Sequence, residues 1–181
     1  MVFFRLIVAD DKDAPVVADF SDVSSGNWFY QAVAYLQKYN IIEGYPDNSF
    51  MPDAPITRAE FAAIASRFDK LELDVPNAFS DVGEDHWAVG FINSAAAKGW
   101  VNGVSDDLFR PDEFILRAQV VVIVNRLLGR GVAVDGIPDG VPLFDDVSVS
   151  HWAFCDIVEA SVGHEFVLDA DGFEVWSSFE G

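Results

Sequence analysis

A nine-residue segment recurs three times in this chain of 181 residues. It reads FSDVSSGNW from Phe20, FSDVGEDHW from Phe79 and FDDVSVSHW from Phe144, so a phenylalanine precedes a tryptophan by eight positions each time. The three starts lie 59 and then 65 residues apart, and units of this size bury too little surface to be stable alone. The sequence therefore predicts an array of similar units that pack against one another.

The agreement continues beyond the tryptophan in the first two units. Gly44 and Gly103 each follow sixteen residues later, and four further residue pairs match at equal spacing: Asp47/Asp106, Phe50/Phe109, Pro52/Pro111 and Arg58/Arg117. The third unit has no such second half, so we interpret it as half a repeat. The predicted divisions are 1–19, the tail of a preceding repeat's second helix with a linker; 20–78 and 79–143, two full repeats; 144–168, half of a third; and 169–181, a C-terminal extension.

Apolar residues within each unit follow helical spacing on both sides of a turn-rich loop. This pattern predicts helices over residues 27–40, 57–71, 85–98, 116–128 and 150–162, with no substantial sheet. At the N-terminus, FFRLI resembles VNRLL at the end of the second repeat, and it places Arg5 opposite Arg126. The predicted fold class is all-α, built from tandem helix-loop-helix repeats.

Composition excludes several classes of function. Hydrophobic residues make up 51% of the chain, which indicates a folded protein, and the net charge of -19 rules out long-range attraction to nucleic acid or to an anionic membrane. No run approaches the roughly 20 apolar residues that span a bilayer, and the first residues do not form a convincing export signal. Any export signal is therefore expected upstream.

Candidate catalytic and metal sites are weak in this sequence. His86 and His151 precede tryptophans without a nucleophile at catalytic spacing, so no enzyme activity and no cofactor are predicted. Three acidic residues near the C-terminus have calcium-loop spacing, but Phe173 and Glu174 stand where a ligand and a glycine belong. We predict no metal there. The single cysteine, Cys155, permits no internal disulfide.

The stretch PITRAE, residues 55–60, contains a charge that helix initiation does not explain. Thr57 and Glu60 are three positions apart and form a capping box at the start of a helix. Arg58 lies between them in the first turn, where the helix dipole disfavours a cation. From the residues alone, a solvated or structural ion pair is the default explanation of Arg58, and ligand binding is the alternative.

In this order, the motifs FSDV, HW, NG, FRP and TRAE resemble the S-layer homology (SLH) domain of bacterial surface proteins. The resemblance extends from Phe20 to Gly163. It implies a mostly helical fold in which about three repeats assemble with pseudo-threefold symmetry. It also implies that an exported protein is attached non-covalently to peptidoglycan-linked cell-wall polysaccharide, often one that carries pyruvate ketals, at the bacterial cell surface.

The resemblance assigns the repeated polar and aromatic residues to glycan binding. It implies that the arginine of each TRAE-like motif lies at a groove between neighbouring repeats and pairs with a sugar carboxylate, which a guanidinium holds through two charge-assisted hydrogen bonds. Tryptophans would provide an apolar face for sugar rings, and aspartates and glycines would line the grooves. The expected glycan-binding residues are Arg58, Arg117, Trp28, Trp87, Trp152, Asp22, Asp81, Asp146, Gly44 and Gly103.

Several alternatives stay open at this point. The tryptophans lie on apolar helical faces and are equally suited to the core, and the aspartates can cap helices or turns. The module can serve protein-protein adhesion at the cell surface, or act as a spacer that binds no glycan. If glycan binding is correct, replacing Arg58 should weaken binding more than tenfold and change folding little. With only two arginine-bearing halves, at most two complete grooves are expected.

Overall fold

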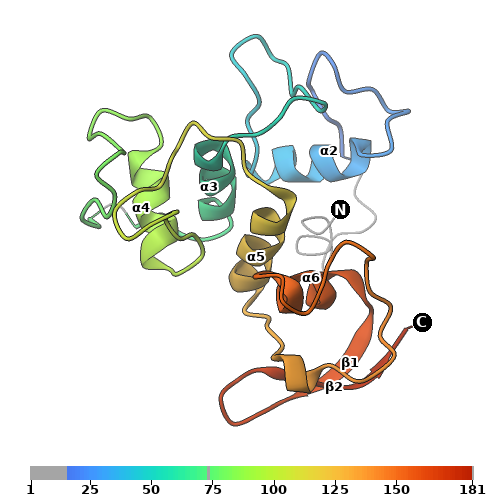
Figure 1. Ribbon diagram of the computed structural model, residues 1–181. Helices are drawn as coiled ribbons and strands as arrows, with labels where there is room; N and C mark the ends of the chain where they lie inside the picture. Colours follow the sequence, from blue (N-terminus) through green and yellow to red (C-terminus); the bar gives the residue numbers. More distant parts are fainter. Residues whose placement is uncertain (1–15, 73, 181) are drawn as a thin grey trace. The chain divides into compact units, whose positions relative to one another are not determined.

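The computed structural model describes residues 16–72 and 74–180, and the chain divides into two compact units, Met1–Ile115 and Leu116–Gly181. The described residues form five α-helices, one short 3-10 helix and one two-stranded hairpin (Figure 1). The mostly helical prediction is confirmed, whereas the all-α class is wrong for the C-terminal hairpin. The predicted helix tail near Arg5 lies outside the described residues.

The first unit contains three helices, α2 (Tyr30–Lys38), α3 (Arg58–Ser66) and α4 (Val89–Ala97). All three coincide with predicted helices and are shorter at their ends. At the start of α3, Thr57 accepts a hydrogen bond from the Glu60 amide, and the Glu60 carboxylate accepts one from the Thr57 amide. The capping box predicted from PITRAE is therefore confirmed.

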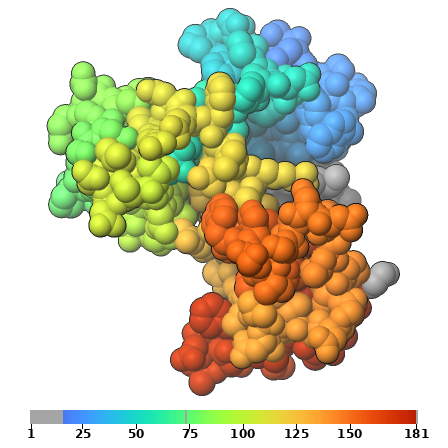
Figure 2. Space-filling view, viewed as in Figure 1, coloured from blue at the N-terminus to red at the C-terminus, as the bar shows by residue number. Residues whose placement is uncertain are grey.

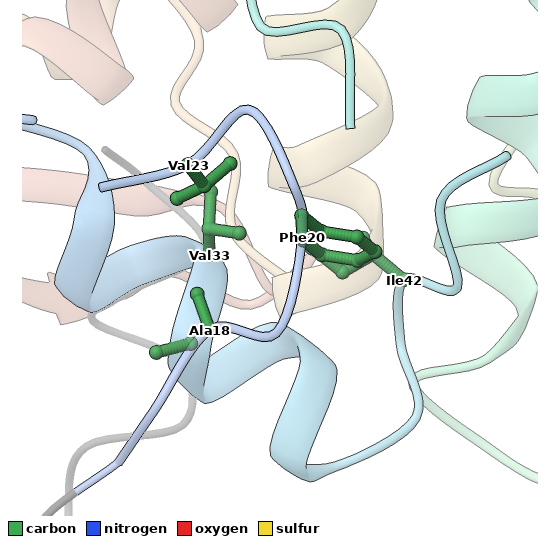
Figure 3. Packing of buried hydrophobic residues seen from close by; sticks show 6 residues of the cluster. Ala18, Phe20, Val23, Val33 and Ile42 are labelled. Atoms are coloured by element: carbon green, nitrogen blue, oxygen red, sulfur yellow. The ribbon is translucent and has the colours of Figure 1, made fainter. Parts of the chain in front are cut away.

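Each of the first two repeats is closed by the same local contacts. Phe20 and Phe50 stack with ring centres 5.5 Å apart, and Phe79 and Phe109 lie 5.2 Å apart. Phe20 belongs to the buried apolar cluster shown in Figure 3, where it lies near Ile42, and the half-buried Phe50 packs against this cluster. In the first two repeats, these phenylalanine pairs thus hold the loop before the second helix against the start of the same repeat.

Helices α3 and α4 pack together, as Figure 1 shows in green and light green. They belong to different repeats, and polar contacts support the packing. Lys98 Nζ donates to the Asp69 carboxylate at 2.6 Å, and Arg67 lies over the Phe91 ring at 5.2 Å. The arginine-bearing helix of the first repeat therefore contacts the tryptophan-bearing helix of the second.

The second unit repeats this pairing with α5 (Arg117–Leu128) and α6 (Phe154–Ser161). The buried Asn125 of α5 donates to the Asp156 carbonyl oxygen at 3.0 Å. A 3-10 helix, η1 (Val134–Gly136), follows α5, and its neighbour Val132 joins Phe154, Val158 and Trp176 in the core. Figure 2 shows the residues of the hairpin, in red, gathered against the light orange residues that follow α5.

The hairpin consists of β1 (His164–Leu168) and β2 (Glu174–Phe179), which pair antiparallel. The five residues between them, Asp-Ala-Asp-Gly-Phe, include an Asp-Gly pair typical of a tight turn, and Gly172 has φ of +86°. Asp169 accepts hydrogen bonds from the amides of Asp171 and Phe173, both at 2.9 Å. The acidic residues with calcium-loop spacing therefore include a turn-forming aspartate. The prediction of no substantial sheet is wrong here, because this turn joins two paired strands.

Candidate functional site

Arg58 is buried rather than exposed, with only 6% of its surface accessible. Its Nε donates to the carbonyl oxygen of Phe109 at 2.7 Å, and Nη2 donates to that of Asn102 at 2.9 Å. The guanidinium carbon also lies 4.6 Å from the centre of the Phe109 ring. Burial lowers the pKa of Arg58, although nearby carboxylates oppose this shift. The arginine of the first repeat is thus embedded in the loop of the second repeat.

The start of α3 is held by the same loop. The amide of Arg58 donates to the Glu113 carbonyl oxygen at 2.8 Å, and the amide of Ala59 donates to that of Pro111 at 3.0 Å. Both amides would otherwise be unpaired at a helix N-terminus and available to an anion. In this structure both amides bond to the loop of the second repeat. The contacts between the repeats therefore explain why a cationic residue is found in the first turn of α3, where the helix dipole disfavours it.

Arg117 has a different environment from its counterpart Arg58. It is exposed, and it makes no hydrogen bond or ion pair with any residue that the structure describes. Only half of the capping box is kept at this helix, because Leu116 has no side-chain acceptor while Gln119 accepts from the Leu116 amide at 2.9 Å. No loop follows in the third repeat to cover the arginine, since residues 164–179 form the hairpin instead. Its guanidinium is therefore available to a ligand.

The three repeat tryptophans are exposed, contrary to the core alternative. The accessible fractions are 79% for Trp28, 58% for Trp87 and 63% for Trp152. Each lies in the turn just before the first helix of its repeat. In the second and third repeats, the preceding histidine accepts a hydrogen bond through Nδ1 from a following backbone amide, at 3.1 Å in both cases. The repeats thus present indole rings to solvent from equivalent, locally fixed positions.

Two of the three candidate aspartates accept hydrogen bonds from backbone amides. Asp22 accepts from the amides of Phe50 and Met51 at 2.8 and 2.7 Å, and Asp81 accepts from the matching amides of Phe109 and Arg110 at the same two distances. These bonds lower the pKa of Asp22; for Asp81 partial burial opposes ionisation, but the bonds outweigh it and its pKa also falls.

These bonds also hold an unusual backbone. Met51 and Arg110 occupy the left-handed region, with φ of 54° and 58°. Asp146 in the third repeat is exposed and has no hydrogen bond to a described residue, because its repeat has no matching loop. The sequence pattern therefore identified the aspartates correctly as repeated features, and their contacts give two of them a structural role.

The candidate glycines are required by packing inside each repeat. A Cβ on Gly44 would collide with the Phe20 ring and with the carbonyl oxygen of Ser49. A Cβ on Gly103 would collide with the Phe79 ring and with two loop carbonyl oxygens. Close approach of a ligand is therefore not needed to explain either glycine.

A shallow hollow in the first unit lies beside one of these glycines. Its lining includes Phe79, Val101, Asn102, Gly103, Ser105 and Asp106. Asn102 links this hollow to Arg58, because its carbonyl oxygen accepts the guanidinium hydrogen bond. Sequence comparison between repeats missed Asn102, since the first repeat has Glu43 at the matching position.

A comparison with protein families matches the same two segments that the sequence repeat defines. The model for the S-layer homology domain matches residues 19–62 and 78–121, which begin one position before each phenylalanine motif and include both arginines. The chain belongs to the S-layer homology family. The matched segments lie in the first two SLH repeats and include α2 and α4, together with the first residues of α3 and of α5.

Similar proteins are found among bacterial surface proteins. The chain is 38% identical to a cellulosome-anchoring protein of Acetivibrio thermocellus, over 97% of this chain and 40% of that protein. It is 33% identical to cell surface glycoprotein 1 of the same organism, over 93% of this chain and 8% of that protein. An amylopullulanase of Thermoanaerobacterium thermosulfurigenes is 33% identical over 65% of this chain and 7% of its own length. The chain thus spans less than half of each of these relatives.

Proposed function

We propose that this SLH chain anchors an exported protein to the bacterial cell wall by binding peptidoglycan-linked polysaccharide without a covalent bond. The observation that carries the proposal is the exposure of Trp28, Trp87 and Trp152. Large aromatic rings held in water at three equivalent positions do not contribute to the core, and a sugar ring is a suitable partner for an indole face. The bacterial cell surface is the location that fits this role.

The relatives support anchoring rather than catalysis as the role of this segment. A segment that is shared by a cellulosome-anchoring protein and an amylopullulanase, and that covers 7% of the latter, is best explained as a common attachment module. In the described part of the chain, no helix is long and apolar enough to cross a membrane. Attachment through the wall polysaccharide requires no such helix.

The two arginines are proposed to differ as carboxylate ligands. Arg117 offers its whole guanidinium, whereas Arg58 has committed Nε and Nη2 to carbonyl oxygens and keeps only Nη1 without a described hydrogen bond. The net charge of -19 means that an anionic glycan must be held by such local contacts. A pyruvate ketal would supply the carboxylate, and Arg117 is the better placed of the two to bind it by a bidentate pair.

A wall-sedimentation assay tests the proposal. Purified cell walls that retain their polysaccharide should pellet the protein, and Trp28→Ala, Trp87→Ala and Trp152→Ala combined should reduce the bound fraction at least tenfold. Because all three rings are more than half exposed, the variant should keep its helical spectrum. Val17→Ala, which removes an apolar side chain that is 74% exposed, serves as the matched control and should bind normally.

The alternatives predict other outcomes in the same assay. A protein-adhesion module would bind walls stripped of polysaccharide equally well, provided that their surface proteins remain. A spacer would pellet with neither preparation. Either result would contradict glycan binding by this chain.

A further inference from the structure

A buried group of ionisable side chains in the second unit is not used by the glycan proposal. Glu159 lies on α6, His164 begins β1 and Glu174 begins β2, and their side chains are exposed by 0%, 1% and 2%. One donor atom from each of these residues lies within 4.8 Å of the other two. Three separate segments thus direct one imidazole nitrogen and two carboxylates to a common point.

The histidine ring is held in one orientation. Its Nδ1 lies 2.8 Å from the carbonyl oxygen of Val162 and donates to it, and the ring stacks on Trp176 with centres 3.7 Å apart. Its Nε2 consequently faces Glu174 Oε2 at 2.9 Å and Glu159 Oε2 at 3.4 Å. Arg130 Nη2 also lies 3.5 Å from this nitrogen. With Nδ1 bonded to a carbonyl oxygen, Nε2 can face two carboxylates favourably in two ways, by carrying a proton or by binding a cation.

Arg130 is the cationic side chain that contacts the Glu159 and Glu174 carboxylates among the described residues. Arg130 is paired with Glu159, and its Nε lies 3.6 Å from Glu174 Oε1. Despite that ion pair, Glu159 Oε1 is buried without a hydrogen bond of acceptable geometry. The Arg130 side chain is 37% exposed, so it has an open path to solvent.

We propose that Glu159, His164 and Glu174 form a binding site for a first-row divalent transition metal ion such as Zn²⁺, with Arg130 turning outward when the ion binds. An imidazole with two carboxylates suits Zn²⁺, whereas Ca²⁺ and Mg²⁺ prefer oxygen ligands alone. Donor separations of 2.9 and 3.4 Å fit ligands that each lie about 2.0–2.2 Å from one ion.

The surroundings of this site match what a metal-binding histidine requires. The bond from Nδ1 to a backbone carbonyl fixes the tautomer that leaves Nε2 free for a metal. Trp176 donates from Nε1 to Glu159 Oε2 at 3.3 Å and orients that carboxylate. A bound ion would connect α6 to both strands of the hairpin and so stabilise the second unit.

Calorimetry with zinc chloride on chelator-stripped protein tests the proposal, with Co²⁺ absorption in the visible range as a second reading. We expect one ion per chain, a higher melting temperature when zinc is present, and a loss of affinity of at least 100-fold in His164→Gln. His86→Gln and His151→Gln are matched controls from outside the cluster and should bind zinc normally. Binding that persists in His164→Gln would overturn the assignment.

Arg130→Gln separates a metal site from a permanent ion-pair network. Because this change removes a competing cation, the proposal predicts tighter zinc binding, by about threefold or more, together with a larger rise in melting temperature on adding zinc. A permanent network predicts a destabilised variant that zinc does not rescue. No zinc binding by either the parent protein or Arg130→Gln would also refute the proposal, whatever the folding of His164→Gln.

Discussion

Replacing Arg58 by alanine should destabilise the fold, and the structure gives the size of the effect. The change removes two hydrogen bonds from a charged donor and the contact with the Phe109 ring, and it leaves the carbonyl oxygens of Phe109 and Asn102 without that donor. Charged hydrogen bonds contribute about 1.5–3 kcal/mol each and are not additive. We expect a loss of about 3 kcal/mol in the free energy of unfolding.

Urea unfolding followed by circular dichroism measures this loss, and Arg117→Ala is the matched control. Arg117 occupies the same repeat position but is exposed, so its replacement should change stability by less than about 0.5 kcal/mol. Arg58→Lys should recover only part of the loss, because an ammonium cannot reproduce the two directed bonds of the guanidinium. If Arg58→Ala and Arg117→Ala unfold at the same urea concentration, the proposed structural role of Arg58 is wrong.

Two further changes test the local contacts. Thr57→Ala removes one half of the capping box and should lower stability by about 1 kcal/mol in the same urea assay, while a cap without energetic weight would leave the midpoint unchanged. The depressed pKa of Asp81 makes its contribution complete above about pH 4, the unfolded value, and lost as pH falls through the lower folded value. Asp81→Asn should therefore lower stability by roughly 1 kcal/mol at pH 7 and by less at pH 2, with the unbonded Asp146→Asn as control; equal losses at both pH values would contradict this assignment.

The helices were predictable because their signals are local. The spacing of apolar residues predicted all five α-helices. Thr57 and Glu60, which lie three residues apart, predicted the start of α3. The hairpin carried a local signal too, an Asp-Gly turn between β-branched and aromatic residues. This signal is ambiguous in the sequence, because the same acidic residues also fit part of the spacing of a calcium loop.

The environment of the candidate site was not predictable in the same way. The carbonyl oxygens that accept hydrogen bonds from the buried Arg58 lie 44 and 51 residues further along the chain. The residues around PITRAE contain no pattern that predicts these distant contacts. The tryptophans follow helical spacing with the apolar residues, yet each lies in the turn before its helix, where the helical face no longer decides burial. The cluster of Glu159, His164 and Glu174 exists only once the hairpin has folded onto α6. The pseudo-threefold arrangement of repeats stays a prediction.

Calorimetric titration of purified wall polysaccharide into the chain, with and without its pyruvate groups, tests the central claim most directly. We expect no more than two binding sites per chain, because only two repeats carry an arginine-bearing half. We also expect Arg117→Ala and removal of pyruvate each to weaken binding more than tenfold, about 1.4 kcal/mol. Because both changes remove the same contact, their combined effect should be no larger than either alone. Three equivalent sites, or binding that is unchanged when Arg117 and pyruvate are both absent, would contradict the central claim.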